Sequence, residues 1–302
     1  MNKKSNKSSC FNISSNMLNP VDNQIRDLLK SGLETLERQL DSDIYTYYGP
    51  IEDSIVPVIK HTIEQIASEK KHSRLSIILT TGGGSATAVE RYVNIIRNFY
   101  GEVNFIVPDF AYSAGTIFCM SGDNIYMNYY SVLGPIDPQV MNKDKRWVPA
   151  LGYLDKINEL IGKAHDKTLT DAEFLILKDF DLAELKGYEQ AKELTIDLLK
   201  KWLVKYKFKN WTNKKKSGIS VTQEMKEKRA EEIADRLSDN KIWKSHGRPI
   251  NIEILRDFLE LVIEDYGENS DLSTNIDSYY SLLDDYVRKN GLQLFIQTRN
   301  FL

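Results

Sequence analysis

Between residues 75 and 139 the sequence twice repeats one order of segments: a short apolar run, a turn of small residues and a helix-like stretch. The first unit joins residues 75–81 to three glycines at 82–84 and then to a helical pattern over 87–100. Runs this short and rich in β-branched residues are typical of buried strands. Successive strand–turn–helix units place their turns on one edge of a parallel sheet, where α/β proteins form their sites. We therefore predict an α/β fold with a functional site at that edge.

The glycine turn separates the first predicted strand from its helix. Gly82, Gly83 and Gly84 carry no Cβ, so their backbone N–H groups can face an incoming oxygen at the positive end of the helix. Donors placed in this way can form an oxyanion hole. A tight turn that requires positive φ angles is the alternative interpretation.

Ser113 begins the helix-like stretch of the second unit, after a predicted strand at 103–107. At the first turn of a buried helix its hydroxyl would lie in the field of the helix N-terminus, which stabilises a developing oxyanion. We expect Ala114 and Gly115 to leave room for a substrate backbone. Serine is also a preferred N-cap residue, so helix capping is the alternative role. The neighbouring glycine turn favours the catalytic one.

A third predicted strand at 124–128 precedes the sequence Val-Leu-Gly-Pro-Ile-Asp-Pro-Gln at 132–139. With Gly-Gly-Gly-Ser at 82–85 and Tyr-Ser-Ala-Gly-Thr at 112–116, this series resembles the Clp-fold serine proteases. Within them it is most similar to the serine dehydrogenase proteinase branch, related to the Clp protease proteolytic subunit and signal peptide peptidase A. The resemblance covers residues 48–139 and returns at 243–250. It implies a ClpP/crotonase-like core of repeated ββα units with a mostly helical C-terminal extension.

The resemblance also implies the activity, a serine peptidase that hydrolyses peptide bonds through an acyl-enzyme. The serine dehydrogenase branch orders its triad serine, aspartate, histidine. The matching positions are Ser113 for the nucleophile, Asp137 and His246 for the other triad members, and the N–H groups of Gly83, Gly84 and Ala114 for the oxyanion hole. In such a triad a neutral imidazole takes the serine proton while a carboxylate fixes the imidazole tautomer.

Two other kinds of residue could serve as the general base for Ser113. His165 follows Ser113 in the serine, histidine, aspartate order of the Clp subunit, but its charged neighbours predict an exposed position, which favours His246. A serine/lysine dyad of the signal peptide peptidase type would require a desolvated lysine. The candidates for that role all lie in polar sequence: Lys143, Lys145, Lys156 and Lys163.

Two non-peptidase functions are also compatible with the fold. A crotonase-like enzyme would use the oxyanion hole for acyl-thioester chemistry without a nucleophile, although the motif around Ser113 argues against it. A non-catalytic Clp-fold subunit would serve binding or assembly. The resemblance implies a homo-oligomer that acts on peptides or unfolded proteins. Because the chain has no Walker-type phosphate loop, ATP hydrolysis would have to come from a separate ATPase or activator partner.

The composition of the chain bears on which ligands it can bind and in which cellular compartment it acts. A net charge of −3 gives no overall attraction to nucleic acid or acidic membranes. The basic and aromatic segment 200–216 could bind single-stranded nucleic acid, but a helix that buries its rings and solvates its lysines is the favoured interpretation. The only cysteines, Cys10 and Cys119, suggest neither a disulfide framework nor a metal site. We expect no cofactor, no membrane-spanning segment and a cytoplasmic location.

The pattern along the chain predicts three regions. Residues 1–19 form a disordered tail, 20–140 the catalytic core, and 141–302 a helical region that returns the histidine segment 243–250 to the core. Beyond the core, apolar spacing predicts helices at 169–203, 222–237, 254–263 and 276–287 and a terminal strand at 292–296.

Overall fold

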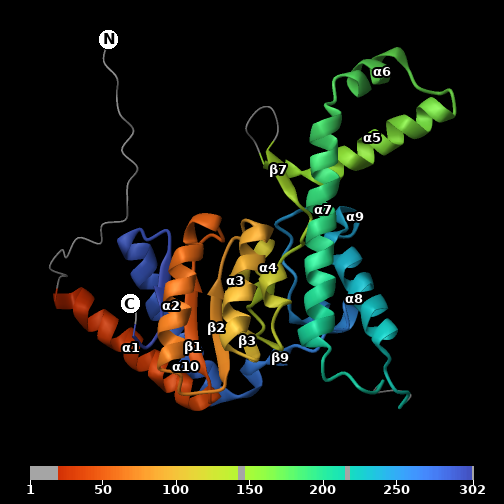
Figure 1. Ribbon diagram of the computed structural model, residues 1–302. Helices are drawn as coiled ribbons and strands as arrows, with labels where there is room; N and C mark the ends of the chain where they lie inside the picture. Colours follow the sequence, from red (N-terminus) through yellow and green to blue (C-terminus); the bar gives the residue numbers. More distant parts are fainter. Residues whose placement is uncertain (1–19, 142–146, 215–217, 301–302) are drawn as a thin grey trace, which may run out of the picture.

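The computed structural model describes residues 20–141, 147–214 and 218–300 (Figure 1). The tail predicted for residues 1–19 lies outside this range, as do Lys143 and Lys145.

A six-stranded sheet forms the centre of the molecule, in the order β10-β1-β2-β3-β5-β9. Its members are β1 (Asp43–Tyr48), β2 (Arg74–Thr80), β3 (Glu102–Ile106), β5 (Asn124–Met127), β9 (Glu264–Asp265) and β10 (Phe295–Gln297). All neighbours pair in parallel except β10, which runs antiparallel to β1. The predicted α/β class and the three strands predicted near residues 75–81, 103–107 and 124–128 are confirmed. The terminal strand predicted at 292–296 is present but begins at Phe295.

Alternating side chains of the strands build two cores, one on each face of the sheet. Ile77, Leu79 and Phe105 belong to a core covered by α2 (Val56–Ser68), α3 (Ala86–Phe99) and α4 (Ala114–Cys119). Ile78 and Ile106 point the other way, toward α1 (Pro20–Leu40) and α10 (Ser270–Asn290). This period of two is what a strand buried on both faces requires.

A second, smaller layer lies at the carboxyl edge of the main sheet. Strands β4 (Phe110–Ala111) and β6 (Val132–Leu133) pair in parallel. Single bridges extend the layer at both sides: Ile51 with Gly84, Thr81 with Ala111, and Leu133 with Ile250. The layer therefore brings the glycine turn, the approach to Ser113 and the chain after His246 together.

A helical arm leaves the core after a hairpin of β7 (Gln139–Met141) and β8 (Trp147–Pro149). Its helices α5 (Ala150–His165), α6 (Asp171–Lys178) and the adjoining part of α7 (Leu182–Trp202) project away from the sheet (Figure 1). The chain returns through a π-helical turn, Leu203–Lys207, and α8 (Gln223–Ser238), which packs along α7 before the short helix α9 (Asn240–Trp243).

One predicted helix is shorter than its apolar spacing suggested. The helical segment ends at Phe258, although the pattern over residues 254–263 predicted a continuous helix. Leu261 and Ile263 are buried in an extended stretch that leads into β9, because pairing with β5 completes the sheet at this side. An apolar residue every three or four positions does not distinguish a helix from a helix followed by a buried strand.

The basic segment agrees with the structural interpretation in part: one of its rings is fully buried, but three of its lysines pair with acids. Trp202 is 1% exposed and belongs to the core. Three lysines of the segment lie against acids: Lys200 against Glu231 at 2.8 Å, Lys201 against Glu90 at 3.4 Å, and Lys209 against Asp123. Part of its positive charge is therefore matched within the fold.

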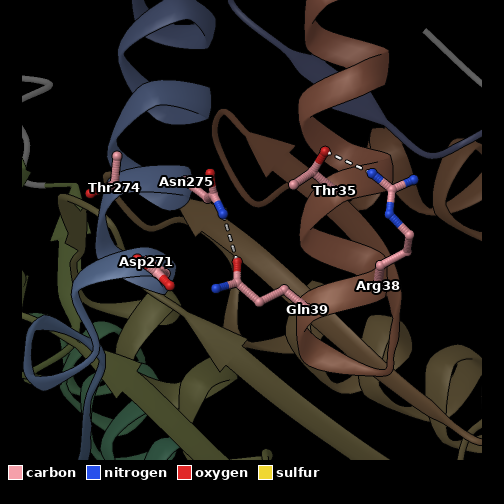
Figure 2. A pocket seen from close by; sticks show the side chains of 6 residues that line it. All are labelled: Thr35, Arg38, Gln39, Asp271, Thr274 and Asn275. Atoms are coloured by element: carbon pink, nitrogen blue, oxygen red, sulfur yellow. Dashed lines mark hydrogen bonds between the residues drawn. The ribbon is translucent and has the colours of Figure 1, made fainter.

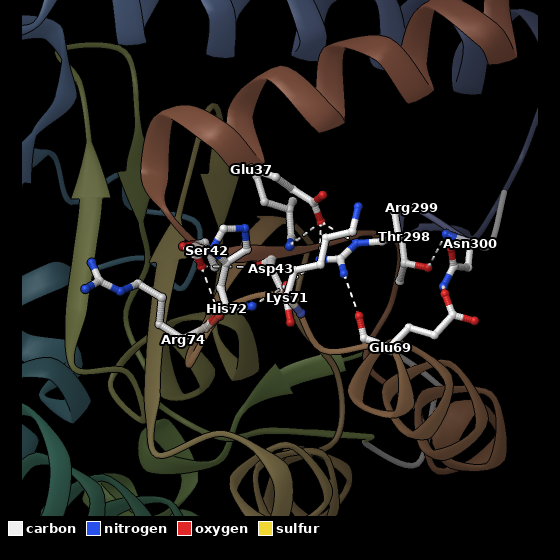
Figure 3. A network of polar contacts seen from close by, with 12 residues as sticks. Glu37, Ser42, Asp43, Glu69, Lys71, His72, Arg74, Thr298, Arg299 and Asn300 are labelled. Carbon is white, nitrogen blue, oxygen red and sulfur yellow. Dashed lines mark hydrogen bonds and ion pairs between the residues drawn. The ribbon is translucent and has the colours of Figure 1, made fainter.

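A buried ionic network ties the end of the described chain to α1 and β1 (Figure 3). The guanidinium of Arg299 contacts Glu37 at 2.8 Å and also Asp43, and all three side chains are at most 4% exposed. Arg299 further donates to the Glu69 carbonyl at 2.9 Å, and the Tyr100 hydroxyl donates to Asp43 at 2.7 Å. Two buried carboxylates thus depend on one cation.

We expect Arg299→Met to lower the free energy of unfolding by about 3–5 kcal/mol, because it leaves buried carboxylates without their cation. Arg38→Met, which removes an exposed arginine of α1, is the matched control and should change stability little. Urea denaturation of both variants measures the difference; equal stabilities would contradict the role given to the network.

Candidate active site

Ser113 occupies a backbone conformation that is unfavourable for any residue other than glycine. Its φ of 53° and ψ of −116° lie at the sharp turn between β4 and α4. Such a conformation costs about 1–3 kcal/mol and persists only where the surrounding structure forces it. Although Ser113 stands at the N-cap position, its side chain makes no capping hydrogen bond, so the capping role is not observed. The hydroxyl remains free for another purpose.

The glycine turn lies directly beside Ser113. Gly83 has a φ of 106°, and a Cβ built on it would lie 2.9 Å from the Ser113 Cβ and 2.9 Å from the Tyr112 carbonyl oxygen. Gly84 has a φ of 145°, and a Cβ there would lie 2.1 Å from the Ile51 carbonyl oxygen. Both glycines therefore meet the positive-φ requirement of the tight-turn interpretation, and the turn also approaches the serine.

The three N–H groups predicted for the oxyanion hole differ in whether they already donate a hydrogen bond. Those of Gly84 and Ala114 donate no hydrogen bond to any residue that the structure describes. The Gly83 N–H instead donates to the Thr81 hydroxyl at 3.1 Å. Two of the three donors are thus unoccupied, while Gly83 would have to leave Thr81 before it could bind a substrate oxygen.

The prediction that Gly115 leaves room for a substrate backbone is wrong. Gly115 is buried, and a Cβ there would lie 2.4 Å from the Thr81 Cγ2. Its missing side chain lets α4 pack against the end of β2. Thr81, which the sequence did not single out, thus contacts both the glycine turn and the helix after Ser113.

Asp137 and His246 are 109 residues apart in the sequence and adjacent in the fold. The Nδ1 atom of His246 lies 2.8 Å from Oδ1 of Asp137. The aspartate side chain is 3% exposed and the imidazole 24%. Because an ionised carboxylate only accepts hydrogen bonds, the Nδ1–H donates, which leaves Nε2 of a neutral imidazole free to take a proton.

Two backbone connections hold the histidine segment against the chain around Asp137. Leu133 and Ile250 exchange two hydrogen bonds of 2.9 Å, and the Ile136 N–H donates to the Leu237 carbonyl at 3.0 Å. Between these anchors the chain forms α9 and the loop that carries His246. The pairing of the second layer therefore determines where the histidine lies.

Thr116 links the helix that follows Ser113 to the segment that leads to Asp137. Its buried hydroxyl accepts from the Gly134 N–H at 3.0 Å and lies 2.9 Å from the carbonyl oxygens of both Ala111 and Gly134. Sequence reasoning missed this residue, although it closes the Tyr-Ser-Ala-Gly-Thr motif. Its position on α4, one turn after Ser113, was the available signal.

Ser113 and His246 are both described, and no hydrogen bond joins their side chains. Hydrogen bonds of catalytic residues are often long in unliganded enzymes and shorten when the substrate binds. The serine turn and the segment that leads to Asp137 nevertheless follow two paired strands, β4 and β6, and Gly134 lies against Tyr112.

The rival bases have surroundings that suit the role poorly. The His165 side chain is 89% exposed at the end of α5 and contacts Asp166. Lys156 pairs with Glu159 at 3.0 Å. Lys163 donates hydrogen bonds to Glu173 and to Glu159, and these bonds raise the pKa of Lys163, which opposes the neutral form that a base requires.

Within residues 20–141, 147–214 and 218–300, no three His, Cys, Asp or Glu side chains are grouped to hold a metal ion. A shallow polar hollow of about 510 Å³ lies between α1 and α10 (Figure 2). It contains none of the predicted site residues and is lined by Thr35, Arg38, Gln39, Asp271, Thr274 and Asn275.

In the part of the chain that the structure describes, no helix combines the length and apolar composition needed to cross a bilayer.

Comparison with known proteins gives a family match over most of the chain. Residues 39–222 match the model of the ClpP-like SDH-type serine proteinases. Two uncharacterized proteins of Methanocaldococcus jannaschii are similar in sequence. One is 26% identical over 82% of this chain and 69% of its own length, and the other 28% identical over 80% and 65%. The chain thus spans about two thirds of the length of these relatives.

Two solved variants of the 1510-N membrane-bound stomatin-specific protease are similar in structure. The variant in complex with a substrate peptide has a TM-score of 0.44 and 15% identity, over 74% of this chain and 75% of that one. The other has a TM-score of 0.31 and 22% identity, over 49% and 76%.

Adjacent glycines of the turn allow a direct test of its geometry. A Cβ at Gly82 would meet no atom within 4 Å, whereas Gly83 combines a positive φ with contacts to Ser113 and Tyr112. We expect Gly83→Ala to lower the free energy of unfolding by about 1–3 kcal/mol and Gly82→Ala to change it little. Denaturant unfolding of the two variants tests this; a larger loss in Gly82→Ala would show that the turn is arranged differently.

Proposed function

The chain belongs to the family of ClpP-like SDH-type serine proteinases, and from this premise we propose that it is a serine endopeptidase with Ser113 as its nucleophile. The observation that carries the proposal is the Ser113 backbone, which is held at a positive φ beside a glycine turn while its hydroxyl caps nothing. Strain of this kind has no use in helix capping. It is consistent with a hydroxyl that must be presented at a sharp turn.

In the proposed reaction the Ser113 hydroxyl attacks the carbonyl carbon of a peptide bond. His246 Nε2 takes the serine proton and then delivers it to the leaving amine, while Asp137 orients the imidazole and stabilises its charged form. The bond to the amine breaks and an acyl-enzyme remains. Water, activated by the same imidazole, releases the acyl group and restores Ser113.

Backbone donors would stabilise the negative charge that develops on the carbonyl oxygen. The N–H groups of Ala114 and Gly84 donate to no residue that the structure describes. The Gly83 N–H could join them after releasing the Thr81 hydroxyl. The loss of one such donor typically lowers kcat by about 100- to 1000-fold.

A triad is favoured over a serine/lysine dyad by the surroundings of the candidate bases. A buried carboxylate holds one nitrogen of His246, which is the arrangement a general base requires. Lys163 has its charged form stabilised by Glu173 and Glu159. Removal of the correct base should therefore affect the reactivity of Ser113, while removal of His165 should not.

The substrates we propose are peptides or unfolded polypeptides, because the glycine turn presents main-chain groups that recognise a backbone rather than a side chain. A separate ATPase or activator would supply unfolded chains to such a site, since the sequence has no phosphate-binding loop of its own. We retain the cytoplasmic location as part of the same proposal.

We expect a fluorophosphonate probe to label the wild-type protein at Ser113 and to leave Ser113→Ala unlabelled. His246→Gln should slow labelling about 100-fold or more, because general-base assistance contributes at least this much. His165→Gln changes an exposed histidine in the same way and should label at the wild-type rate. The labelling rate is measured by mass spectrometry of the intact chain.

Three outcomes would contradict the assignment. Labelling that persists in Ser113→Ala would move the nucleophile elsewhere. Slow labelling of His165→Gln with normal labelling of His246→Gln would exchange the two histidines, and a folded wild-type protein that never reacts would favour a non-catalytic subunit.

A further inference from the structure

Helix α6, at the end of the arm, exposes more apolar surface than a solvated helix needs. Phe174 is 54% exposed, Leu175 65% and Ile176 50%, and the three are consecutive in the sequence. The helix lies away from the central sheet (Figure 1), and no described element covers these side chains. At 100° per residue Phe174 and Leu175 lie on one side of the helix, whereas Ile176 lies nearly opposite them. Neighbouring exposed apolar side chains such as Phe174 and Leu175 commonly mark an interaction surface.

The helix is held in one orientation by contacts on its other side. Thr170 and Glu173 form a capping box at its N-terminus, and Glu173 also binds Lys163 of α5. After its C-terminus, the ring of Phe180 packs against Tyr153 at a centroid distance of 5.8 Å. The exposed face is therefore presented by a fixed helix.

One face of α6 has a charge pattern that is complementary to itself. At 100° per residue, Asp171, Phe174, Leu175 and Lys178 share a face, with the acid at its start and the base at its end. Neither Asp171 nor Lys178 forms an ion pair with another described residue. In an antiparallel copy of this face, each Asp171 would lie opposite the Lys178 of the other copy.

The spacing suits such a pairing. Seven residues of helix correspond to about 10 Å, so two ion pairs would bracket Phe174 and Leu175 of both copies. An acid in the first turn of a helix and a base in its last turn are also favoured by the helix dipole. The dipole does not explain the exposed apolar residues between Asp171 and Lys178. A contact in which the same patch is used twice has two-fold symmetry and closes on itself.

We propose that α6 is a self-association surface, on which two copies of this chain pack antiparallel about a two-fold axis between Phe174 and Leu175. The apolar side chains supply the buried centre of the contact. The two Asp171–Lys178 pairs fix the antiparallel register, since a parallel arrangement would place like charges opposite each other. The inference does not depend on the peptidase activity.

Exchange of the two charges tests the register. Asp171→Lys places two lysines opposite each other at both ends of the contact, and Lys178→Asp places two acids there. We expect each single variant to raise the dissociation constant of the dimer at least about tenfold, and Asp171→Lys combined with Lys178→Asp to restore it. Sedimentation velocity of the full chain measures the dissociation constant. Asp166→Lys, the same charge change on the neighbouring exposed turn, is the control and should associate as the wild type does.

Phe174→Glu tests the apolar centre and should give a monomer with an unchanged circular dichroism spectrum. A wild-type chain that stays monomeric at the highest concentration measured would overturn the proposal, and so would a double-charge variant that fails to recover association. Self-association unaffected by all four α6 variants would place the contact on another surface. Because mass is the readout, these outcomes are independent of whether Ser113 reacts with a fluorophosphonate.

Discussion

The close approach of the glycine turn to Ser113 is the constraint on which the site depends. Gly83 leaves no space for a side chain beside the serine, and Gly115 leaves none against Thr81. At these two contacts the start of α4 packs directly against the end of β2. Ser113 lies between the two contacts, and its backbone adopts a positive φ. The free energy that this conformation costs is offset by the surrounding core, where Ala114, Ile117 and Phe118 are almost fully buried.

The second requirement is a long-range one. Asp137 is nearly inaccessible to solvent, and a buried carboxylate is stable only when it is paired. His246 supplies the partner, and it does so because Leu133 and Ile250 pair across the second layer. The arm and α8 lie between these segments in the sequence. The chain therefore leaves the core after Asp137 and returns to the same site at His246.

Much of the core could be read from the sequence because its signals are local. The apolar runs that became β2, β3 and β5 are short, the first of them is rich in β-branched residues, and the glycine and serine turns lie directly between strand and helix. Asp137 and His246 came from motif resemblance and not from spacing, since nothing local connects residues so far apart. The helix predicted over residues 254–263 failed for a related reason: the free edge of β5, which draws the chain into β9, exists only in the folded sheet.

The residues that sequence reasoning missed act through tertiary contacts. The hydroxyls of Thr81 and Thr116 matter because of the backbone groups they meet, which lie on other segments. Arg299 likewise gains its role only where Glu37 and Asp43 are brought to the same buried point. Composition also could not show that the lysines near residue 200 lie beside acids from distant helices.

The most direct test of the central claim is a crystal structure of the chain after reaction with a fluorophosphonate. We expect a bond between phosphorus and the Ser113 Oγ, with the phosphoryl oxygen about 2.7–3.1 Å from the Ala114 nitrogen and from a nitrogen of the glycine turn. We also expect His246 Nε2 within hydrogen-bonding distance of the adduct. A phosphoryl oxygen that faces solvent, with every histidine remote from it, would contradict the convergence of these groups on one site.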